Sequence, residues 1–336
     1  MIIKYKTISI LIISLVIVVG CSDKNVINEN DSLSCNFTDI TGTCCELNEV
    51  DCNSICFGLS ECSGCTDTLA INFDSEALLD DNNCIYDSFA DSTFWDLVWN
   101  DEFNSSNIDI NKWDYDIGMG DWGWGNNEEQ YYTNNSNNSF IEDGKLIIQA
   151  MLQDYGGANY TSARMVTRNR GDWTYGRYVI RAKIPSGIGT WPAIWMLPTD
   201  WVYGGWPYSG EIDIMEAVGF EHGVIHANTH SETYNWNFGI PPSSGSIYIE
   251  DFNTEFHDYI IEWNENIIKW YVDDILYHSY VNNNQGTSTW PFNQDFHLLL
   301  NIAIGGTWGG QQGIDNSIFP VQMKIDFVRV YQKKIQ

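Results

Sequence analysis

The sequence predicts an all-β sandwich that is preceded by a small disulfide-rich module. From Phe94 onward, short apolar runs are separated by turn-forming segments such as Asp143–Gly144, and no long stretch has helical periodicity. Before that point, eight of the nine cysteines lie within Cys35–Cys84, and none follows. The composition therefore changes at one boundary, between a short crosslinked segment and a long strand-rich domain.

The first 20 residues are predicted to be an export signal. Lys4 and Lys6 precede the apolar run Ile8–Val19, which is too short for a comfortable membrane span. The run ends at Gly20-Cys21, which resembles the lipobox of bacterial lipoproteins, where cleavage leaves Cys21 as the acylated first residue. This resemblance implies an outer-membrane lipoprotein at the surface of the bacterial cell envelope, in contact with the membrane only through its lipid anchor. An ordinary signal peptide is the alternative.

A tether and a crosslinked module follow the signal. Residues 21–34 are polar and aperiodic, which predicts a flexible tether. Residues 35–88 are too few to hold together by burial alone, and their even number of cysteines indicates disulfides in an exported protein. Gly64–Tyr86 resembles a short module of bacterial surface proteins, and this resemblance implies a Cys65–Cys84 disulfide. We expect a spacer, with carbohydrate binding as the alternative.

The domain predicted over residues 93–333 is built from short strands. Its strand-like runs are rich in Val, Ile, Tyr, Phe and Trp, and turn residues separate them. Many short strands with few helices are typical of a β-sandwich. The six clearest runs are Lys145–Ala150, Gly176–Ile184, Asp258–Trp263, Ile267–Val272, His297–Ile304 and Met323–Tyr331.

The charge and the aromatic content of the chain indicate which classes of partner it can bind. The formal net charge is -29 at pH 7, so the chain repels phosphate backbones, and we exclude nucleic acid as a partner. The 15 tryptophans exceed the need of one core, and surplus indoles are typical of platforms for the flat apolar faces of sugar rings. We expect a monomer that binds a polysaccharide.

Three carboxyl groups stand within one apolar stretch, Ser209–Gly219. In a regular strand side chains alternate between faces, so Glu211 and Asp213 share one face and Glu216 points to the other. An ionised Glu216 in the core would be unfavourable. One extra residue, a β-bulge near Ile214–Met215, returns Glu216 to the face of the other two acids.

Two glutamates that lean together on one face suit a retaining glycoside hydrolase, in which the carboxyl groups lie about 5–5.5 Å apart. Glu211 is then the expected nucleophile and Glu216 the expected acid/base. Asp213 between them can share a proton, so that Glu211 is ionised and Glu216 is protonated when the reaction starts. An acidic strand edge and a metal site are the alternatives.

These acids carry a specific resemblance. Glu211-Ile-Asp-Ile-Met-Glu216 resembles the signature of glycoside hydrolase family 16 in its bulged form, and the similarity covers nearly all of residues 95–332. The resemblance implies a β-jelly roll with a concave substrate cleft. Trp99–Phe103 resembles the opening strand, and further segments resemble the laminarinase-like branch: Gly123–Thr133, Tyr160–Met165, Gly189–Pro198 and Gly305–Asp315.

The resemblance also implies the substrate contacts. They are Asn126, Arg164, Trp191, Trp195, His230 and Trp308. Trp191 and Trp195 lie four residues apart on one strand face and would stack under sugar rings, although alternation alone favours core packing for Trp195. Arg164 would bind a sugar hydroxyl or else pair with an acid. His230 is expected near Glu216, or else as a structural histidine.

A calcium site is implied in the same way. Asp326 on the last strand resembles the calcium ligand of the family, and backbone carbonyls near Glu102 and Gly144 would complete the site. Ligation by oxygen alone suits Ca²⁺. The ion would be structural and would lie on the convex face, away from the cleft.

The sequence therefore predicts an endo-acting, retaining β-1,3-glucanase of the laminarinase type. Mixed-linkage glucan, agarose and carrageenan are alternative substrates, because enzymes that act on algal galactans share the bulged motif. A non-catalytic glucan-binding lipoprotein is the alternative from a different class. Such binders typically lack one or more of the acids, whereas all three are present here.

Overall fold

The computed structural model describes residues 95–236 and 240–334, together with Ala77 and four two-residue strands. The chain divides into two units, residues 1–89 and 90–336. The first unit contains two strand pairs, the antiparallel pair β1–β2 and the parallel pair β3–β4. Their bounds are β1 Phe37–Thr38, β2 Cys44–Cys45, β3 Ser63–Gly64 and β4 Leu79–Asp80.

Several predictions for the first unit lie outside the described residues. They concern the signal 1–20, the acylated Cys21, the tether and the Cys65–Cys84 disulfide. These stay predictions.

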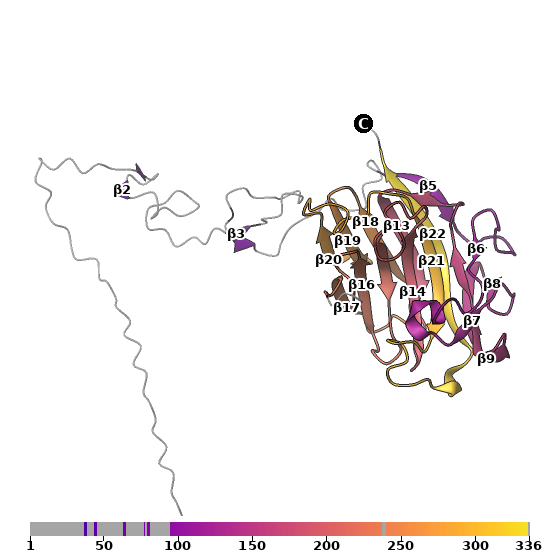
Figure 1. Cartoon of the computed structure of the whole chain (residues 1–336). Coiled ribbons are helices and arrows are strands. Elements are labelled where there is room, and N and C mark those ends of the chain that lie inside the picture. Colours follow the sequence, from indigo (N-terminus) through magenta and orange to yellow (C-terminus); the bar gives the residue numbers. More distant parts are fainter. Residues whose placement is uncertain are drawn as a thin grey trace, which may run out of the picture. The chain divides into compact units, whose positions relative to one another are not determined.

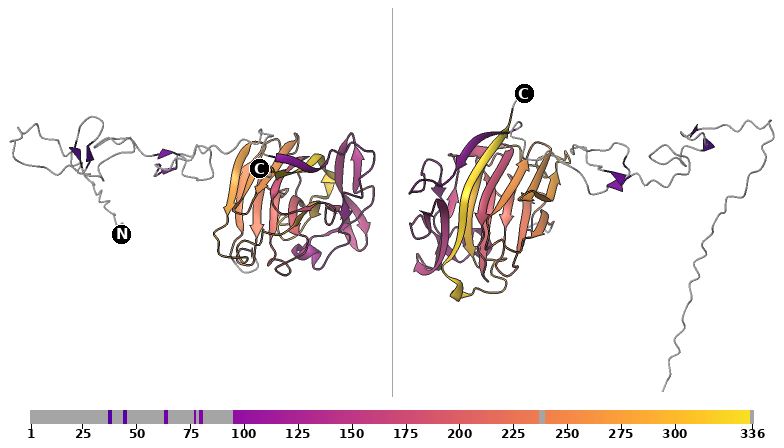
Figure 2. Two further views of the ribbon diagram at one scale, coloured as in Figure 1. Left: turned by 90° about the horizontal axis from the view of Figure 1, so that it is seen from above. Right: turned by 180° about the vertical axis from the view of Figure 1, so that it is seen from behind.

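The second unit is a sandwich of two sheets, as Figures 1 and 2 show. One sheet has ten strands and the other has eight. The predicted all-β fold is confirmed, and the six predicted strands are all present. The ten-stranded sheet has the order β20 (Ile275–Val281), β19 (Ile267–Val272), β18 (His257–Trp263), β13 (Gly176–Lys183), β22 (Val321–Lys333), β9 (Lys145–Tyr155), β10 (Ala158–Ser162) and β7 (Gln130–Tyr132). In addition, β5 (Trp95–Asp101) pairs with β22, and β8 (Ser139–Glu142) pairs with β9.

The eight-stranded sheet carries the predicted acids. Its order is β17 (Ser243–Tyr248), β16 (Val224–His230), β15 (Glu211–Glu216), β14 (Thr190–Pro198), β21 (Phe296–Ile304), β11 (Arg164–Val166) and β6 (Asp114–Tyr115), and β12 (Asp172–Trp173) pairs with β21. The described part of the chain contains the short helical turns η2 (Gly123–Asn127) and η4 (Asn316–Ile318). Among the described residues, no helix has the length and apolar character to cross a bilayer.

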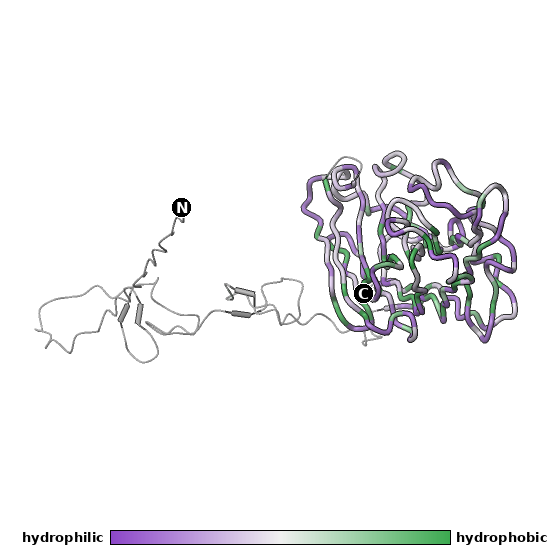
Figure 3. The backbone as a smooth tube through the Cα atoms, turned by 90° about the horizontal axis from the view of Figure 1, so that it is seen from below, coloured by the Kyte–Doolittle hydropathy of each residue, from purple (hydrophilic) through white to green (hydrophobic). Residues whose placement is uncertain are grey.

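The hydrophobic core lies between the two sheets. On β21, Leu298, Leu300 and Ile302 belong to this core, whereas the alternate residues Leu299 and Asn301 lie on the opposite face of the sheet. Figure 3 shows that the hydrophobic stretches follow the strands, while most of the connecting segments are hydrophilic or neutral. The side of the eight-stranded sheet that faces away from the core is called the outer face below. It carries the candidate site.

Candidate active site

Strand β15 contains the predicted bulge. Towards β14, Trp195 pairs with Asp213 and Ile194 pairs with Met215, so Ile214 has no partner of its own. Towards β16 the register shifts in the same way between Asp213 and Glu216. The bulge at Ile214–Met215 is therefore confirmed.

The bulge brings the three acids to the outer face. Ile212, Ile214 and Met215 are all buried in the core, which leaves the opposite face for the carboxyl groups. Across the β15–β16 ladder, Glu211 stands opposite His230, Asp213 opposite Asn228, and Glu216 opposite His226. The apolar residues between the acids thus pack this strand against the core. The five-residue separation of Glu211 and Glu216 predicted this arrangement.

Glu211 is held by an indole and lies beside a second buried acid. The Trp206 indole N–H donates to the Glu211 carboxylate at 2.8 Å. Burial above all, and then the charges of Asp213 and Glu216, raise the pKa of Glu211 to about 8, although His230 and the Trp206 donor oppose this rise. The environment of Glu211 is therefore set by burial first and by charge second.

Asp213 is the more deeply buried member of the pair. Burial raises the pKa of Asp213 well above its usual range, the charge of Glu216 raises it further, and a hydrogen bond joins it to Glu211. The hydrogen bond with Glu211 lowers the pKa of Asp213, which is the effect of a bond that Asp213 accepts. The proton-sharing role predicted for Asp213 stays a prediction.

Glu216 is fixed by two donors from the neighbouring strands. The Trp191 indole N–H on β14 donates to one carboxylate oxygen at 2.9 Å, and the Asn228 amide on β16 donates to the other at 2.7 Å. The residue as a whole is 8% exposed, so these bonds orient the carboxyl group at the edge of the solvent. A carboxyl group offers about four lone-pair positions, so a proton fits beside both donors.

The expected position of His230 was wrong. Its Nε2 lies 3.4 Å from Asp213 and 3.8 Å from Glu211. Glu216 lies at the other end of the row that Glu211, Asp213 and Glu216 form on the outer face, which is called the acidic row below. The reason is the register of β16, which places His226, not His230, across from Glu216. His226 in turn hydrogen-bonds to Glu221 at 2.9 Å.

Aromatic side chains gather beside Glu216. The Trp191 and Trp308 rings meet edge to face with their centroids 5.5 Å apart, and Trp308 meets His226 in the same way at 5.0 Å. Trp308 comes from the Gly-rich loop after β21, so this loop lies over the end of the acidic row. The structure thus brings together two of the predicted substrate contacts, Trp191 and Trp308.

Trp195 and Arg164 form a second group on the outer face. Trp195 is partly exposed, and its indole donates to Asn301 at 2.7 Å. The Arg164 guanidinium lies over the Trp195 ring at 4.8 Å and over the Trp124 ring at 4.4 Å. Arg164 also pairs with Asp116 at 3.1 Å, which is the alternative that the sequence left open. A sugar contact by Arg164 stays a prediction.

Asn126 lies in the turn η2 next to a buried acid. Its amide approaches Glu128 at 3.4 Å, and its backbone carbonyl accepts from Thr307 at 2.7 Å. Burial raises the pKa of Glu128, although the Gln130 amide also donates to it, at 2.7 Å. Asn126 therefore joins η2 to the Gly-rich loop, and its predicted sugar contact remains untested.

Two residues of the site were missed from the sequence. Asn228 sits two positions from His226 and from His230, so strand alternation places all three on one face, and this signal was available. Trp206 lies in the loop before β15, where no periodicity applies. Both donate to an acid, which makes them the nearest supports of the reacting groups.

The predicted calcium site is surrounded by cations. Lys145 lies 3.3 Å from one carboxylate oxygen of Asp326, and Arg181 lies 3.7 Å from the other. The Glu102 carboxylate accepts two bonds of 2.8 Å from Arg329, which leaves only its carbonyl for a metal. These side chains do not by themselves fit a Ca²⁺ site. Backbone carbonyls, such as those predicted near Glu102 and Gly144, would have to supply most of the ligands.

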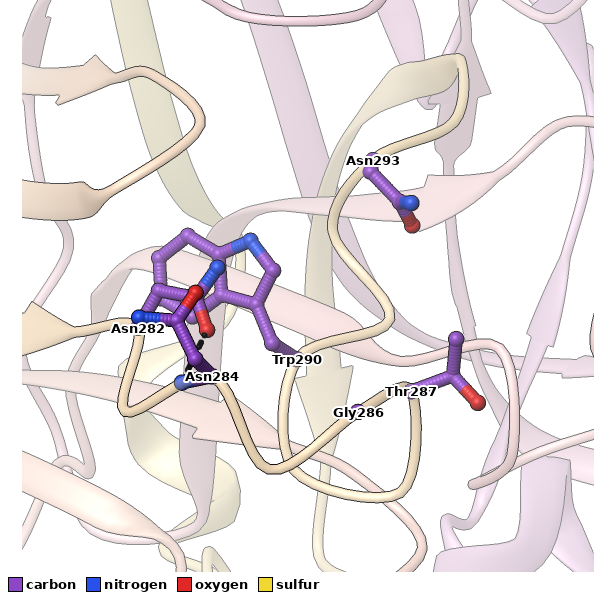
Figure 4. Close-up of a pocket in the computed structure, with 6 residues that line it drawn as sticks. All are labelled: Asn282, Asn284, Gly286, Thr287, Trp290 and Asn293. Atoms are coloured by element: carbon purple, nitrogen blue, oxygen red, sulfur yellow. Dashed lines mark hydrogen bonds between the residues drawn. The ribbon is translucent and has the colours of Figure 1, made fainter.

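A separate hollow lies in the loop after β20. Its volume is about 220 Å³, and it is lined by Asn282, Asn284, Gly286, Thr287, Trp290 and Asn293 (Figure 4). None of these side chains ionises near neutral pH, so the hollow has no acid/base pair. The Tyr203 hydroxyl donates to Asn293 at 2.8 Å and so joins this rim to the loop that carries Trp206.

Removing the indole donor of Glu211 should change the pH dependence of activity. Glu211 has to be ionised to act as the predicted nucleophile, so its raised pKa should place the acid limb of kcat/KM well above pH 4.5. Because the Trp206 N–H lowers this pKa, Trp206→Phe should move the acid limb to still higher pH. The measurement is kcat/KM on laminarin against pH, with Trp201→Phe in the same loop as control. An unmoved or lowered limb contradicts the assignment.

Known proteins resemble the chain along this whole domain. The model of Glycosyl hydrolases family 16 matches residues 126–329. The β-glucanase of Rhodothermus marinus is 51% identical over 247 residues, which cover 71% of this chain and 85% of that protein. The X-ray structure of the laminarinase from Rhodothermus marinus has 50% identity and a TM-score of 0.69, and the match covers 72% of this chain and 98% of that one.

A third relative was crystallised with a sugar chain. SCLam, a non-specific endo-β-1,3(4)-glucanase from family GH16, was co-crystallised as a variant with 1,3-β-D-cellotriosyl-glucose. It has 41% identity and a TM-score of 0.68, and the match covers 71% of this chain and 95% of that one. The family model spans more than half of this chain and includes all of β15 with its three acids. The chain therefore belongs to glycosyl hydrolases family 16.

Proposed function

We propose that the chain is a retaining endo-β-1,3-glucanase that cleaves glucan of the laminarin type. The observation that carries this proposal is the bulge in β15, which gathers Glu211, Asp213 and Glu216 on the outer face. The β-glucanase and the laminarinase of Rhodothermus marinus, at 51% and 50% identity, support the same reaction and the same substrate.

In the first step Glu216 protonates the glycosidic oxygen while Glu211 attacks the anomeric carbon. The bond from carbon to the leaving oxygen breaks, and a glycosyl-enzyme forms on Glu211. The Trp206 N–H supports the attack, since it stabilises the Glu211 carboxylate, and a proton shared with Asp213 would do the same. This support is electrostatic and is already in place before the substrate arrives.

In the second step Glu216, now ionised, takes a proton from water, and the water oxygen attacks the same carbon from the opposite side. The bond to Glu211 breaks, and the sugar leaves with its original β configuration. The donors Trp191 and Asn228 support this step because they hold the Glu216 carboxylate in one orientation. Sugar rings would stack on Trp191 and Trp195 along β14.

A substrate panel tests the proposal. Purified protein is incubated with laminarin, lichenan, agarose and carrageenan, and released oligosaccharides are measured by their reducing ends. We expect laminarin to be cleaved internally, with β-configured product appearing first in the proton NMR spectrum. Faster cleavage of agarose or carrageenan would change the substrate, and initial α product would refute the retaining mechanism. Binding without cleavage would favour the glucan-binding alternative.

Export and lipid anchoring form a second part of the proposal. It rests on the lipobox-like junction at Cys21, which lies outside the described residues. We expect Cys21→Ala to stop incorporation of labelled palmitate and to move the protein from the membrane fraction to the soluble fraction, with the activity on laminarin unchanged. The remaining eight cysteines serve as the built-in control, because the substitution leaves them in place. Unchanged labelling would contradict the anchor.

A structural calcium ion near Asp326 is the last part of the proposal. Its support is the resemblance of Asp326 to the family ligand, and its difficulty is the pairing of Asp326 with Lys145 and Arg181. Chelation should then lower the melting temperature by several degrees, and added Ca²⁺ should restore it, while kcat changes less. Equal melting temperatures with and without chelator contradict the site.

A further inference from the structure

The bulge in β15 is held from the facing sheet. Trp270 on β19 is fully buried, and its indole N–H donates to the backbone carbonyl of Asp213 at 2.8 Å. Tyr277 on β20 donates its hydroxyl to the carbonyl of Ile214 at 3.5 Å. Both donors belong to the ten-stranded sheet, whereas both acceptors belong to the eight-stranded sheet. These two bonds therefore cross the core and end on the bulge.

A buried bulge needs donors of this kind. Where two residues of β15 stand opposite one residue of β16, the ladder leaves backbone groups without a strand partner. A buried carbonyl without a donor is unfavourable, because no water reaches it. The regular register would complete the ladder but would turn Glu216 into the core. Donors to the carbonyls of Asp213 and Ile214 therefore favour the register in which the acids share one face.

A neighbouring tryptophan shows that an indole N–H buried in this core does not require a hydrogen-bond acceptor. Trp263 on the adjacent strand β18 belongs to the same core cluster and is only 1% exposed. Its indole N–H has no hydrogen-bond partner. An indole can thus fill this core without donating, so the donation by Trp270 is a specific feature of the bulge.

We infer that Trp270 is a positioning residue for catalysis, whose N–H fixes the bulge and so the mutual placement of Glu211 and Glu216. The inference rests on the proposed glucanase function. The platforms Trp191 and Trp195 lie on β14, so loosening of the bulge should disturb the reacting groups more than substrate binding. A misplacement of about 1 Å can lower the rate by as much as about 10²-fold.

The test compares Trp270→Phe with Trp263→Phe on laminarin. Each variant loses the same atoms from the same core, but only Trp270→Phe loses a hydrogen bond to β15. We expect kcat of Trp270→Phe to fall by about tenfold or more, with KM within about twofold and with both limbs of the pH profile displaced. We expect Trp263→Phe to lose less thermal stability, because it gives up no hydrogen bond, and to keep kcat within about twofold of the wild type.

A variant closer in shape guards against misfolding. If Trp270→Phe does not fold, 3-benzothienylalanine incorporated at position 270 keeps the bicyclic ring and replaces the N–H by sulfur. Equal kcat in the two Phe variants, or losses of kcat that follow the losses of melting temperature in both, overturns the inference. A wild-type protein without activity on any glucan overturns the proposed function, and this inference with it, before any variant is compared.

Discussion

Replacing Glu211 by serine is expected to abolish hydrolysis of laminarin. The serine hydroxyl is shorter than the carboxylate and is not ionised, so no group reaches the anomeric carbon to form the glycosyl-enzyme. We expect kcat to fall by at least about 10⁴-fold. KM should change little, because Trp191 and Trp195 remain in place. Release of reducing sugar at saturating laminarin measures the loss.

The fold should survive this substitution. The Glu211 side chain lies on the outer face, and its pKa is raised by burial and by the neighbouring acids. Removing it relieves repulsion within the acidic row, so the melting temperature should stay the same or rise. The matched control is Glu265→Ser, in the turn between β18 and β19, which should keep full activity. Near-normal activity of Glu211→Ser on any glucan would refute the nucleophile.

The bulge could be predicted from the spacing of the three acids in the sequence. Glu211 and Asp213 are two residues apart, but Glu216 follows after three more, which breaks the period of a strand. A charged group in the core is unfavourable, whereas one extra residue in the strand restores a single polar face. The order of acidic and apolar residues therefore predicts the local backbone geometry without any information on tertiary contacts.

The partners of the acids could not be predicted in the same way. His226, Asn228 and His230 occupy one face of β16, and a shift of two residues along the ladder would exchange their positions without exposing the core. Alternation therefore predicts the face but not the register. His230 was expected near Glu216 for this reason, whereas the observed register places it beside Glu211 and Asp213.

Contacts made by loops and contacts between the two sheets could not be predicted from the sequence, for a different reason. Trp206 reaches Glu211 from an irregular loop, and Trp270 reaches Asp213 across the core from the other sheet. Both contacts depend on how separate elements pack together. In the sequence, each tryptophan is only one of fifteen.

Replacing Glu216 by alanine should produce a different pattern of loss, which depends on the leaving group. Without the acid, cleavage of laminarin should slow by about 10²- to 10⁴-fold, because the departing sugar oxygen needs a proton. An aryl β-glucoside with a good leaving group needs no proton in the first step, so glycosyl-enzyme should form on Glu211 and accumulate. The measurement is the initial burst of phenolate, which should match the enzyme concentration.

Azide distinguishes the two acids by the product that each variant gives. In Glu216→Ala, azide needs no general base and can attack the glycosyl-enzyme in place of water, which restores turnover and yields a β-glycosyl azide. In Glu211→Ala, azide takes the place of the missing carboxylate and yields an α-glycosyl azide. Opposite anomers from the two variants assign the two roles independently of any rate. If both variants give the same anomer, or if azide does not rescue Glu216→Ala, the assignment of Glu216 as acid/base is wrong. In Glu216→Ala, a nucleophile that needs no general base restores turnover only if the general base has been lost.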